Sequence, residues 1–303
     1  MDSESDESEN LKALIRTADI ATPLSQMIRE SIEFAYEHRS RFSDDPAEGS
    51  RAQTEFSKDT GSPLSHRRRD IEAAHESAAG IYILSAAYFL TALARLLAAD
   101  MELFAYLSVA RSTVECAAKA WWLDDADATA DERLARFHAD NLDNIDEMAK
   151  AKRLAEPELS RRRKQLIQRA ARSGIEPKLS KKNELIGFGG AGKIVSTTLA
   201  GRFFSVLGFE DGDLWYRQTS AVVHATTYGL LDFFQLTDIP GSEFKELHPS
   251  LSIEDVRRTA IVSTQAYLGA IEVDCRYFGW ESERVAEYRQ QLLEQMTSLT
   301  FQV

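Results

Sequence analysis

Residues 78–94 have the sequence AAGIYILSAAYFLTALA, a run of 17 residues without a charged side chain. Such a run is at the short limit for a membrane-spanning helix. Small and hydroxyl-bearing residues make up much of it, Arg95 ends it, and the next apolar segment carries Arg111, Glu115 and Lys119 at its middle. We therefore expect a central helix that other helices bury on all sides, and no membrane as a partner.

Helical spacing of apolar residues dominates the rest of the chain, and strand-like alternation is almost absent. We expect residues 68–99 and 100–123 to form an antiparallel hairpin, with a very short turn and Asp100 as the N-cap of the second helix. Further helices are expected at about 11–41 (or two helices broken near Pro23), 129–155, 157–174, 213–236, 252–278 and 281–299. The predicted fold class is all-α, a helical bundle with a long central antiparallel helix hairpin and a basic, polar excursion.

Composition and charge divide the chain into four parts. Residues 1–9 form an acidic tail that we expect to be disordered. Residues 10–128 hold the N-terminal helices and the central hairpin, 129–195 form the basic helical excursion with a glycine-rich loop, and 196–303 complete the same bundle. The two isolated cysteines indicate reduced packing residues, and the N-terminus lacks the pattern of a signal peptide. These features favour a soluble cytoplasmic protein.

The excursion differs from the rest of the chain in charge. The whole protein has a formal net charge of −12, which disfavours a general DNA-coating protein, and we expect no DNA partner. Residues 150–184, however, hold 12 basic and four acidic side chains. The clusters in this segment are Arg161, Arg162, Arg163 and Lys164, and then Lys181 and Lys182. They form either a solvated helix face or a docking surface for nucleic-acid phosphates.

Patterns typical of cofactor and metal sites find little support. The segment Gly187–Lys193 matches the glycine and lysine positions of a phosphate-binding loop, but Ile194 follows where such a loop needs Ser or Thr. No hydrophobic strand precedes it, so a flexible hinge is the simpler interpretation. The six histidines are scattered, and no pair has metal-ligand spacing on an apolar helix. We expect no cofactor and no metal.

Two pairs of polar residues lie within otherwise apolar helices. Arg111 and Glu115 are four positions apart, so they can pair on one helix face. Charges in such a helix are costly to bury unless they are paired, which leaves a compensated ion pair or a solvent-filled cleft as interpretations. Arg217 and His224 are seven positions apart, almost two turns, and project from nearly the same face.

The spacing of the second pair is not rare in this chain. An arginine followed by four to six residues and a histidine occurs four times, at 68–75, 69–75, 133–138 and 217–224. Only Arg217 and His224 combine an apolar helix with a shared face, and Gln218 follows the arginine directly.

This late helix resembles those of the HEPN superfamily of helical proteins, many of which are ribonucleases of toxin–antitoxin and antiphage systems. The chain is also similar to an uncharacterised bacterial helical family that pairs an Arg-Ser-x-x-Glu helix with a later Tyr-Arg-x-x-Ser-x-x-x-His helix. Residues 111–115 fit the first element, and Tyr216, Arg217, Ser220 and His224 fit the second. The resemblance covers about residues 81–234.

The resemblance implies a metal-independent endoribonuclease of a toxin–antitoxin or antiviral defence system. His224 would act as general base or acid on the ribose 2′-OH and the leaving oxygen, and Arg217 would stabilise the charged phosphoryl transition state. Arg111 and Glu115 would orient this catalytic site. RNA, a second copy in a homodimer, and an antitoxin or defence protein are the implied partners. The alternative is a non-catalytic helical interaction or adaptor protein in which the Arg/His/Glu cluster is a structural polar network.

Overall fold

The computed structural model describes residues 3–42, 45–58, 66–99, 105–209, 212–224, 226, 234–238, 245–249 and 252–299. The helices are α1 (Ser3–Ser40), α2 (Arg51–Lys58), α3 (His66–His75), η1 (Glu76–Ile83), α4 (Leu84–Ala98), α5 (Ala105–Asp124), α6 (Ala130–Lys150), α7 (Glu156–Arg172), α8 (Ser196–Val206), α9 (Gly212–Val223), α11 (Ile253–Phe278) and α12 (Ser282–Ser298). The strands are β1 (Pro177–Leu179), β2 (Leu185–Phe188), β3 (Ala191–Gly192), β4 (Phe234–Asp238) and β5 (Lys245–Pro249). The predicted all-α class is confirmed.

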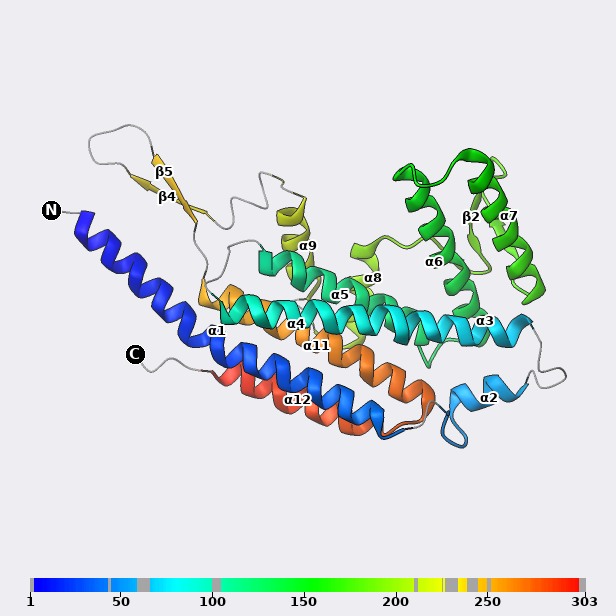
Figure 1. The fold of residues 1–303 in the computed structure, drawn as a ribbon, viewed down its shortest axis with the longest axis horizontal. Helices are drawn as coiled ribbons and strands as arrows, with labels where there is room; N and C mark the ends of the chain where they lie inside the picture. The colour runs from blue at the N-terminus through cyan, green and yellow to red at the C-terminus, as the bar shows by residue number, and fades with distance from the viewer. Residues whose placement is uncertain are drawn as a thin grey trace.

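The core of the bundle forms around α11. This helix is buried at every position from Thr259 to Ile271 and packs against α1, α5 and α12 (Figure 1). Its start follows the predicted capping sequence, because the Ser252 hydroxyl accepts a 3.0 Å hydrogen bond from the Asp255 backbone N–H. It ends where Gly279 adopts a left-handed conformation with φ of 76°. Helices α4 and α5 pack side by side on α11, as the predicted hairpin requires; its turn and Asp100 lie outside the described residues.

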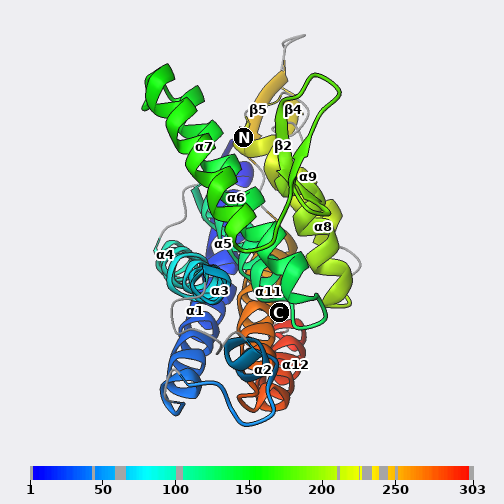
Figure 2. The same cartoon turned by 90° about the vertical axis from the view of Figure 1, so that its right-hand side faces the viewer.

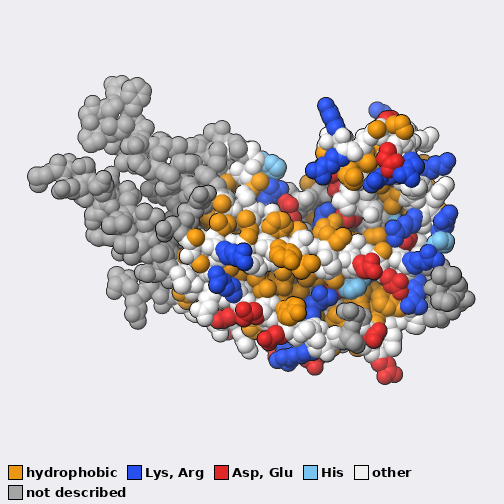
Figure 3. All heavy atoms as spheres, viewed as in Figure 1, with side chains coloured by type: hydrophobic (Ala, Val, Ile, Leu, Met, Phe, Trp, Pro, Cys, Tyr) orange, Lys and Arg blue, Asp and Glu red, His pale blue; other side chains and the backbone are white. Residues whose placement is uncertain are grey.

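The central helix is less buried than the sequence predicts. Helices α3, η1 and α4 continue one another over 66–98, with η1 as a π-helical segment. By length and composition this helix could cross a membrane. Only 33% of its most apolar stretch of 18 residues is buried in the molecule. Ile81, Leu84 and Tyr88 are 58%, 50% and 69% exposed, and hydrophobic side chains gather along this helix in Figure 3. The expectation of burial on all sides is therefore wrong, because one face packs on α1 and α5 and the other meets solvent.

Helices α6 and α7 project from one end of the bundle with a small sheet (Figures 1 and 2). We call residues 129–195 the basic arm. Thr129 begins it with a capping box, since its hydroxyl accepts from the Glu132 backbone N–H and the Glu132 carboxylate accepts from the Thr129 backbone N–H. The segment 175–195, which lacks an evident pattern in the sequence, forms the antiparallel sheet β1-β2-β3. A separate hydrophobic cluster, including Leu134, Leu166 and Phe188, holds the arm together.

One predicted helix ends earlier than the sequence indicates. The predicted helix over 213–236 ends as α9 at Val223, and residues 234–238 instead form β4, which pairs antiparallel with β5. Helix α1 begins at Ser3 and runs unbroken through Pro23, so one helix forms where the sequence allows one or two. The disorder expected for residues 1–9 stays a prediction.

Candidate functional site

The first predicted pair lies at the contact between α5 and α9. Arg111 Nη2 lies 2.8 Å from Glu115 Oε1, and the hydroxyl of Tyr216 on α9 donates a 2.5 Å hydrogen bond to the same oxygen. The Arg111 guanidinium also lies 5.6 Å from the centre of the Tyr216 ring, within cation–π range. We call Arg111, Glu115 and Tyr216 the polar cluster.

The polar cluster lies at the edge of the core and is partly open to solvent. The side chains of Arg111 and Glu115 are 14% and 30% exposed, whereas Tyr216 is fully buried. Burial, and then the hydrogen bond to Glu115, raise the pKa of Tyr216 to about 12. The phenol is therefore protonated at neutral pH and acts as a donor, and the cluster fastens α9 to α5.

The second predicted pair is separate from this cluster. The Arg217 side chain is 63% exposed, and its Nε lies 2.9 Å from Oδ2 of Asp213, one turn earlier on α9. His224 follows the last residue of α9 in an exposed turn, where its backbone N–H donates to Ser220 O at 3.0 Å. Among the described contacts, Glu115 therefore binds Tyr216 and not Arg217 or His224. Of the four predicted catalytic residues, the structure brings Arg111 and Glu115 together and leaves Arg217 and His224 at the surface.

The predicted nucleic-acid-binding residues all lie on the basic arm, where Lys and Arg side chains gather in Figure 3. Arg161 and Arg162 share the Glu158 carboxylate at 2.7 Å each, and these hydrogen bonds lower the pKa of Glu158 to about 2. Arg163 lies 2.6 Å from Asp146.

The predicted lysines are placed differently. Lys164 on α7 and Lys181 and Lys182 in the turn between β1 and β2 are exposed. Among the described residues, the lysines that form ion pairs are Lys119, Lys150 and Lys193, and not these three. The basic arm therefore carries uncompensated positive charge at its surface.

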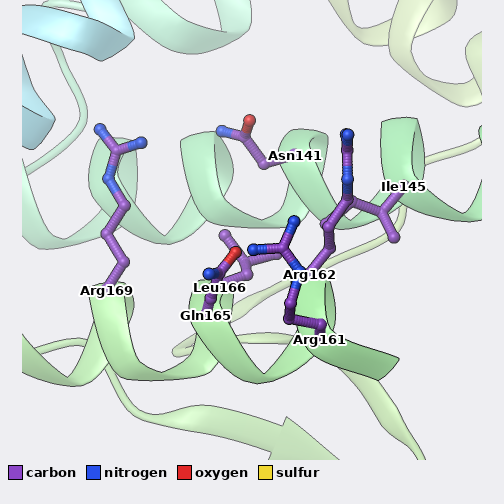
Figure 4. Close-up of a pocket in the computed structure, with 7 residues that line it drawn as sticks. All are labelled: Asn141, Ile145, Arg161, Arg162, Gln165, Leu166 and Arg169. Carbon is purple, nitrogen blue, oxygen red and sulfur yellow. The ribbon is translucent and has the colours of Figure 1, made fainter. Parts of the chain in front are cut away.

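An open groove of about 500 Å³ lies between α6 and α7. Its lining residues are Asn141 and Ile145 from α6 and Arg161, Arg162, Gln165, Leu166 and Arg169 from α7 (Figure 4). None of these described lining residues is acidic. We call this feature the α6–α7 groove. Sequence reasoning included Arg161 and Arg162 but missed Arg169, which stands two turns further along the same face of α7 and outside the cluster of adjacent basic residues.

The glycine-rich segment is a β-hairpin and not a phosphate-binding loop. Gly187 pairs with Gly192 and Phe188 with Ala191 across β2 and β3. A Cβ on Gly187 would lie 2.2 Å from the Ala191 carbonyl oxygen, so this close strand pairing requires glycine. Lys193, in the position of a phosphate-binding lysine, pairs with the Asp146 carboxylate.

Two buried clusters of charged side chains have no signal in the sequence. In one, Asp70 accepts hydrogen bonds from Arg169, at 2.5 Å, and from Ser173, and lies 3.3 Å from His138. Burial raises the pKa of Asp70, but the contacts from His138, Ser173 and Arg169 outweigh burial and hold that pKa below its usual value.

The second buried cluster contains His75, Asp124 and Asp274, from α3, α5 and α11. His75 Nδ1 lies 3.1 Å from Asp124 Oδ2 and 3.6 Å from Asp274 Oδ1. Sequence reasoning missed this cluster because long sequence separations give it no local spacing motif.

Comparison with known proteins assigns no family. No protein-family model, no curated protein and no solved structure matches this chain.

Proposed function

We propose that this protein binds RNA through phosphate contacts in the α6–α7 groove. The observation that carries the proposal is an open groove lined by Arg161, Arg162 and Arg169, with no acidic residue among its described lining residues. The planar guanidinium group matches the geometry of a phosphate and can donate two parallel hydrogen bonds to it. RNA is the nucleic acid we propose because the Arg217–His224 helix resembles that of a superfamily rich in ribonucleases.

The ion pairs at the groove are compatible with phosphate binding. Arg161 and Arg162 are 60% and 41% exposed and share the single carboxylate of Glu158. Exposed pairs of this kind contribute about 0 to 1 kcal/mol, so exchanging the carboxylate for a phosphate costs little. Lys164, Lys181 and Lys182 add positive charge on the same arm that attracts a polyanion over a longer range.

The spacing of the arginines supports contact with the RNA backbone. Arg161 and Arg169 are eight residues apart on α7, which corresponds to about 12 Å along the helix axis. Arg169 donates a hydrogen bond to Asp70, but its side chain is 45% exposed, so it adds positive charge for a second phosphate at a separate point of the groove. Residues 150–184 contain no aromatic side chain on which a base could stack. Binding through this arm should depend on charge and RNA shape, with little preference for base sequence.

The test is a binding titration with a fluorescently labelled RNA hairpin at several salt concentrations. The double variant Arg161→Gln/Arg162→Gln should lose about tenfold or more in affinity, and the slope of log affinity against log salt should fall by about 1 to 2. The matched control, Arg29→Gln/Arg284→Gln, removes the same charge from exposed positions on α1 and α12 and should bind as the wild type does. Equal binding by both double variants, or no binding by the wild type, would overturn the proposal.

A second candidate function is cleavage of RNA by Arg217 and His224. Both residues are exposed, Arg217 in the middle of α9 and His224 directly after its last residue, and access to a substrate is what a catalytic pair requires. His224 would move the proton of the ribose 2′-OH, and Arg217 would stabilise the phosphoryl transition state. The polar cluster would then position α9 without touching the RNA.

This candidate is tested by incubating RNA with the purified protein in EDTA. Cleavage should yield 2′,3′-cyclic phosphate ends and should be lost in Arg217→Ala and in His224→Gln. His66→Gln, which alters an exposed histidine on α3, is the matched control and should cleave normally. Cleavage that survives in both α9 variants would exclude this pair, and groove binding without cleavage would leave an RNA-binding protein.

A further inference from the structure

The buried cluster of His75, Asp124 and Asp274 has the donor set of a metal site. It offers one imidazole nitrogen and two carboxylate oxygens, and the three donor atoms all lie within 4.8 Å of one another. The two separations from His75 Nδ1, 3.1 Å to Asp124 and 3.6 Å to Asp274, lie on either side of about 3.3 Å. That value is the edge of a tetrahedron whose bonds have the usual zinc lengths.

Hydrogen bonding within the cluster is incomplete. Asp274 is 0% exposed, yet neither of its carboxylate oxygens takes part in a hydrogen bond among the described residues. Arg39 Nε lies 3.0 Å from Asp274 Oδ2, at ion-pair distance but without hydrogen-bond geometry, and Oδ1 faces His75. Burying a carboxylate without hydrogen bonds costs free energy. Arg39 lies beside Oδ2, so a cation bound beside Oδ1 would stabilise the other oxygen.

A small cavity lies next to Asp124, the ligand from α5. Its volume is about 10 Å³, close to that of one water molecule. Glu55, Arg133 and Tyr277 also line it, and the Tyr277 hydroxyl donates a 3.0 Å hydrogen bond to Glu55. A water in this cavity would lie beside Asp124 and find further polar partners in Glu55, Arg133 and Tyr277, which would help to orient the Asp124 carboxylate.

We propose that His75, Asp124 and Asp274 bind one divalent transition-metal cation of the zinc class. The cation would join α3, α5 and α11, so its role would be to stabilise the fold. The competing occupant is a proton on His75 Nδ1. That proton can bond to Asp124 at 3.1 Å but leaves Asp274 Oδ1 without a hydrogen bond, whereas a metal ion would bind both carboxylates. The proposal is independent of RNA binding, because the α6–α7 groove shares no residue with this cluster.

The experiment uses the full chain, stripped of metal with a chelator and titrated with Zn²⁺, Mn²⁺ or Mg²⁺. We expect one Zn²⁺ per chain by calorimetry and elemental analysis, and a rise of several degrees in melting temperature at saturating Zn²⁺. Mg²⁺ should give no such rise, because it prefers an all-oxygen octahedral site. His75→Gln should lose the zinc-dependent rise.

The matched control is Asp140→Asn, which alters a buried carboxylate paired with Lys119 outside this cluster, and it should keep the rise. If His75→Gln does not fold, the absorption spectrum of Co²⁺ bound to the wild type gives an independent readout. Visible bands of the intensity typical of four-coordinate cobalt are expected. Absence of stoichiometric Zn²⁺ binding, featureless Co²⁺ spectra, or equal Zn²⁺ binding by wild type and His75→Gln would overturn the proposal.

Discussion

Tyr216 on α9 donates a 2.5 Å hydrogen bond to Glu115 on α5, and this contact lies on the side of α9 that faces the core. Trp215, Tyr216, Thr219 and Val222 form the buried side of α9. Successive helical residues differ by about 100° in direction, so burial of Tyr216 turns Arg217 toward solvent. The arginine then pairs with Asp213 instead of joining the polar cluster.

Removing the Tyr216 hydroxyl tests how much this contact contributes to stability. Tyr216→Phe keeps the buried ring but deletes the donor to Glu115, and we expect the free energy of unfolding to fall by about 1 kcal/mol. The loss stays modest because Glu115 is 30% exposed and water can replace the hydroxyl. The measurement is urea denaturation at pH 7.

The matched control is Tyr88→Phe, which deletes the same atom from a side chain that is 69% exposed. Its stability should stay within about 0.5 kcal/mol of the wild type. Equal stability of the two variants would mean that the polar cluster does not hold α9 in place.

One of the two polar contacts of Glu115 could be predicted from the sequence. The spacing of four residues is enough to pair Arg111 with Glu115, because neighbours on one helix face need no tertiary information. Tyr216 could not be assigned to Glu115, since that contact depends on how α9 packs against α5. The same limitation applies to His75, Asp124 and Asp274, which only the tertiary fold brings together.

The buried carboxylate of Asp70 predicts a loss of stability in acid. Its pKa is lower in the folded protein than in the unfolded chain, so the folded state favours the ionised form. The resulting stabilisation is complete above the unfolded pKa of about 4 and is lost as the pH falls through the lower folded pKa. Asp70→Asn should cost about 3 kcal/mol at pH 7, because Arg169 and Ser173 lose an anionic partner.

The pH profile separates this effect from a general loss of packing. The difference in unfolding free energy between wild type and Asp70→Asn should shrink as the pH falls below about 4. Asp213→Asn, whose side chain is 41% exposed, should follow the wild type across the same range. A difference for Asp70→Asn that is independent of pH would rule out the charge of Asp70 as its source.

Long apolar helices were predictable from sequence, and short strands were not. Helix α11 was predicted at both ends because Ser252 caps its start and apolar spacing continues to Phe278. The apolar spacing predicts a helix up to residue 236, although Phe234 and Leu236 of β4 alternate with polar residues. That signal covers only five residues, and its pairing with β5 is a contact between separate segments that local periodicity does not encode.

The hairpin of the basic arm predicts a contrast between two glycines. In Gly187→Ala the added Cβ would lie 2.2 Å from the Ala191 carbonyl oxygen, so β2 and β3 must separate. We expect a loss of about 1 to 3 kcal/mol in the stability of the arm, measured by hydrogen exchange of its amides. Gly190→Ala in the same hairpin is the control, because a Cβ there meets nothing within 4 Å. Equal protection of the arm's amides against hydrogen exchange in the two variants would contradict the close strand pairing.

The two faces of the central helix predict a contrast between two leucines. Leu90 is fully buried, so Leu90→Ala should cost about 2 to 5 kcal/mol through lost burial and the resulting cavity. Leu84 is 50% exposed on the same helix, and Leu84→Ala should cost less than about 1 kcal/mol. Both values come from urea denaturation at several protein concentrations.

The concentration series also tests whether a second copy covers the exposed face. If Leu84 were buried between two copies of the chain, the stability of the wild type would rise with protein concentration, because association is linked to folding. Leu84→Ala would then cost nearly as much as Leu90→Ala. Concentration-independent stability with a small loss for Leu84→Ala is the result we expect for a face that meets solvent, and it would place any contact between two copies of the chain on another surface.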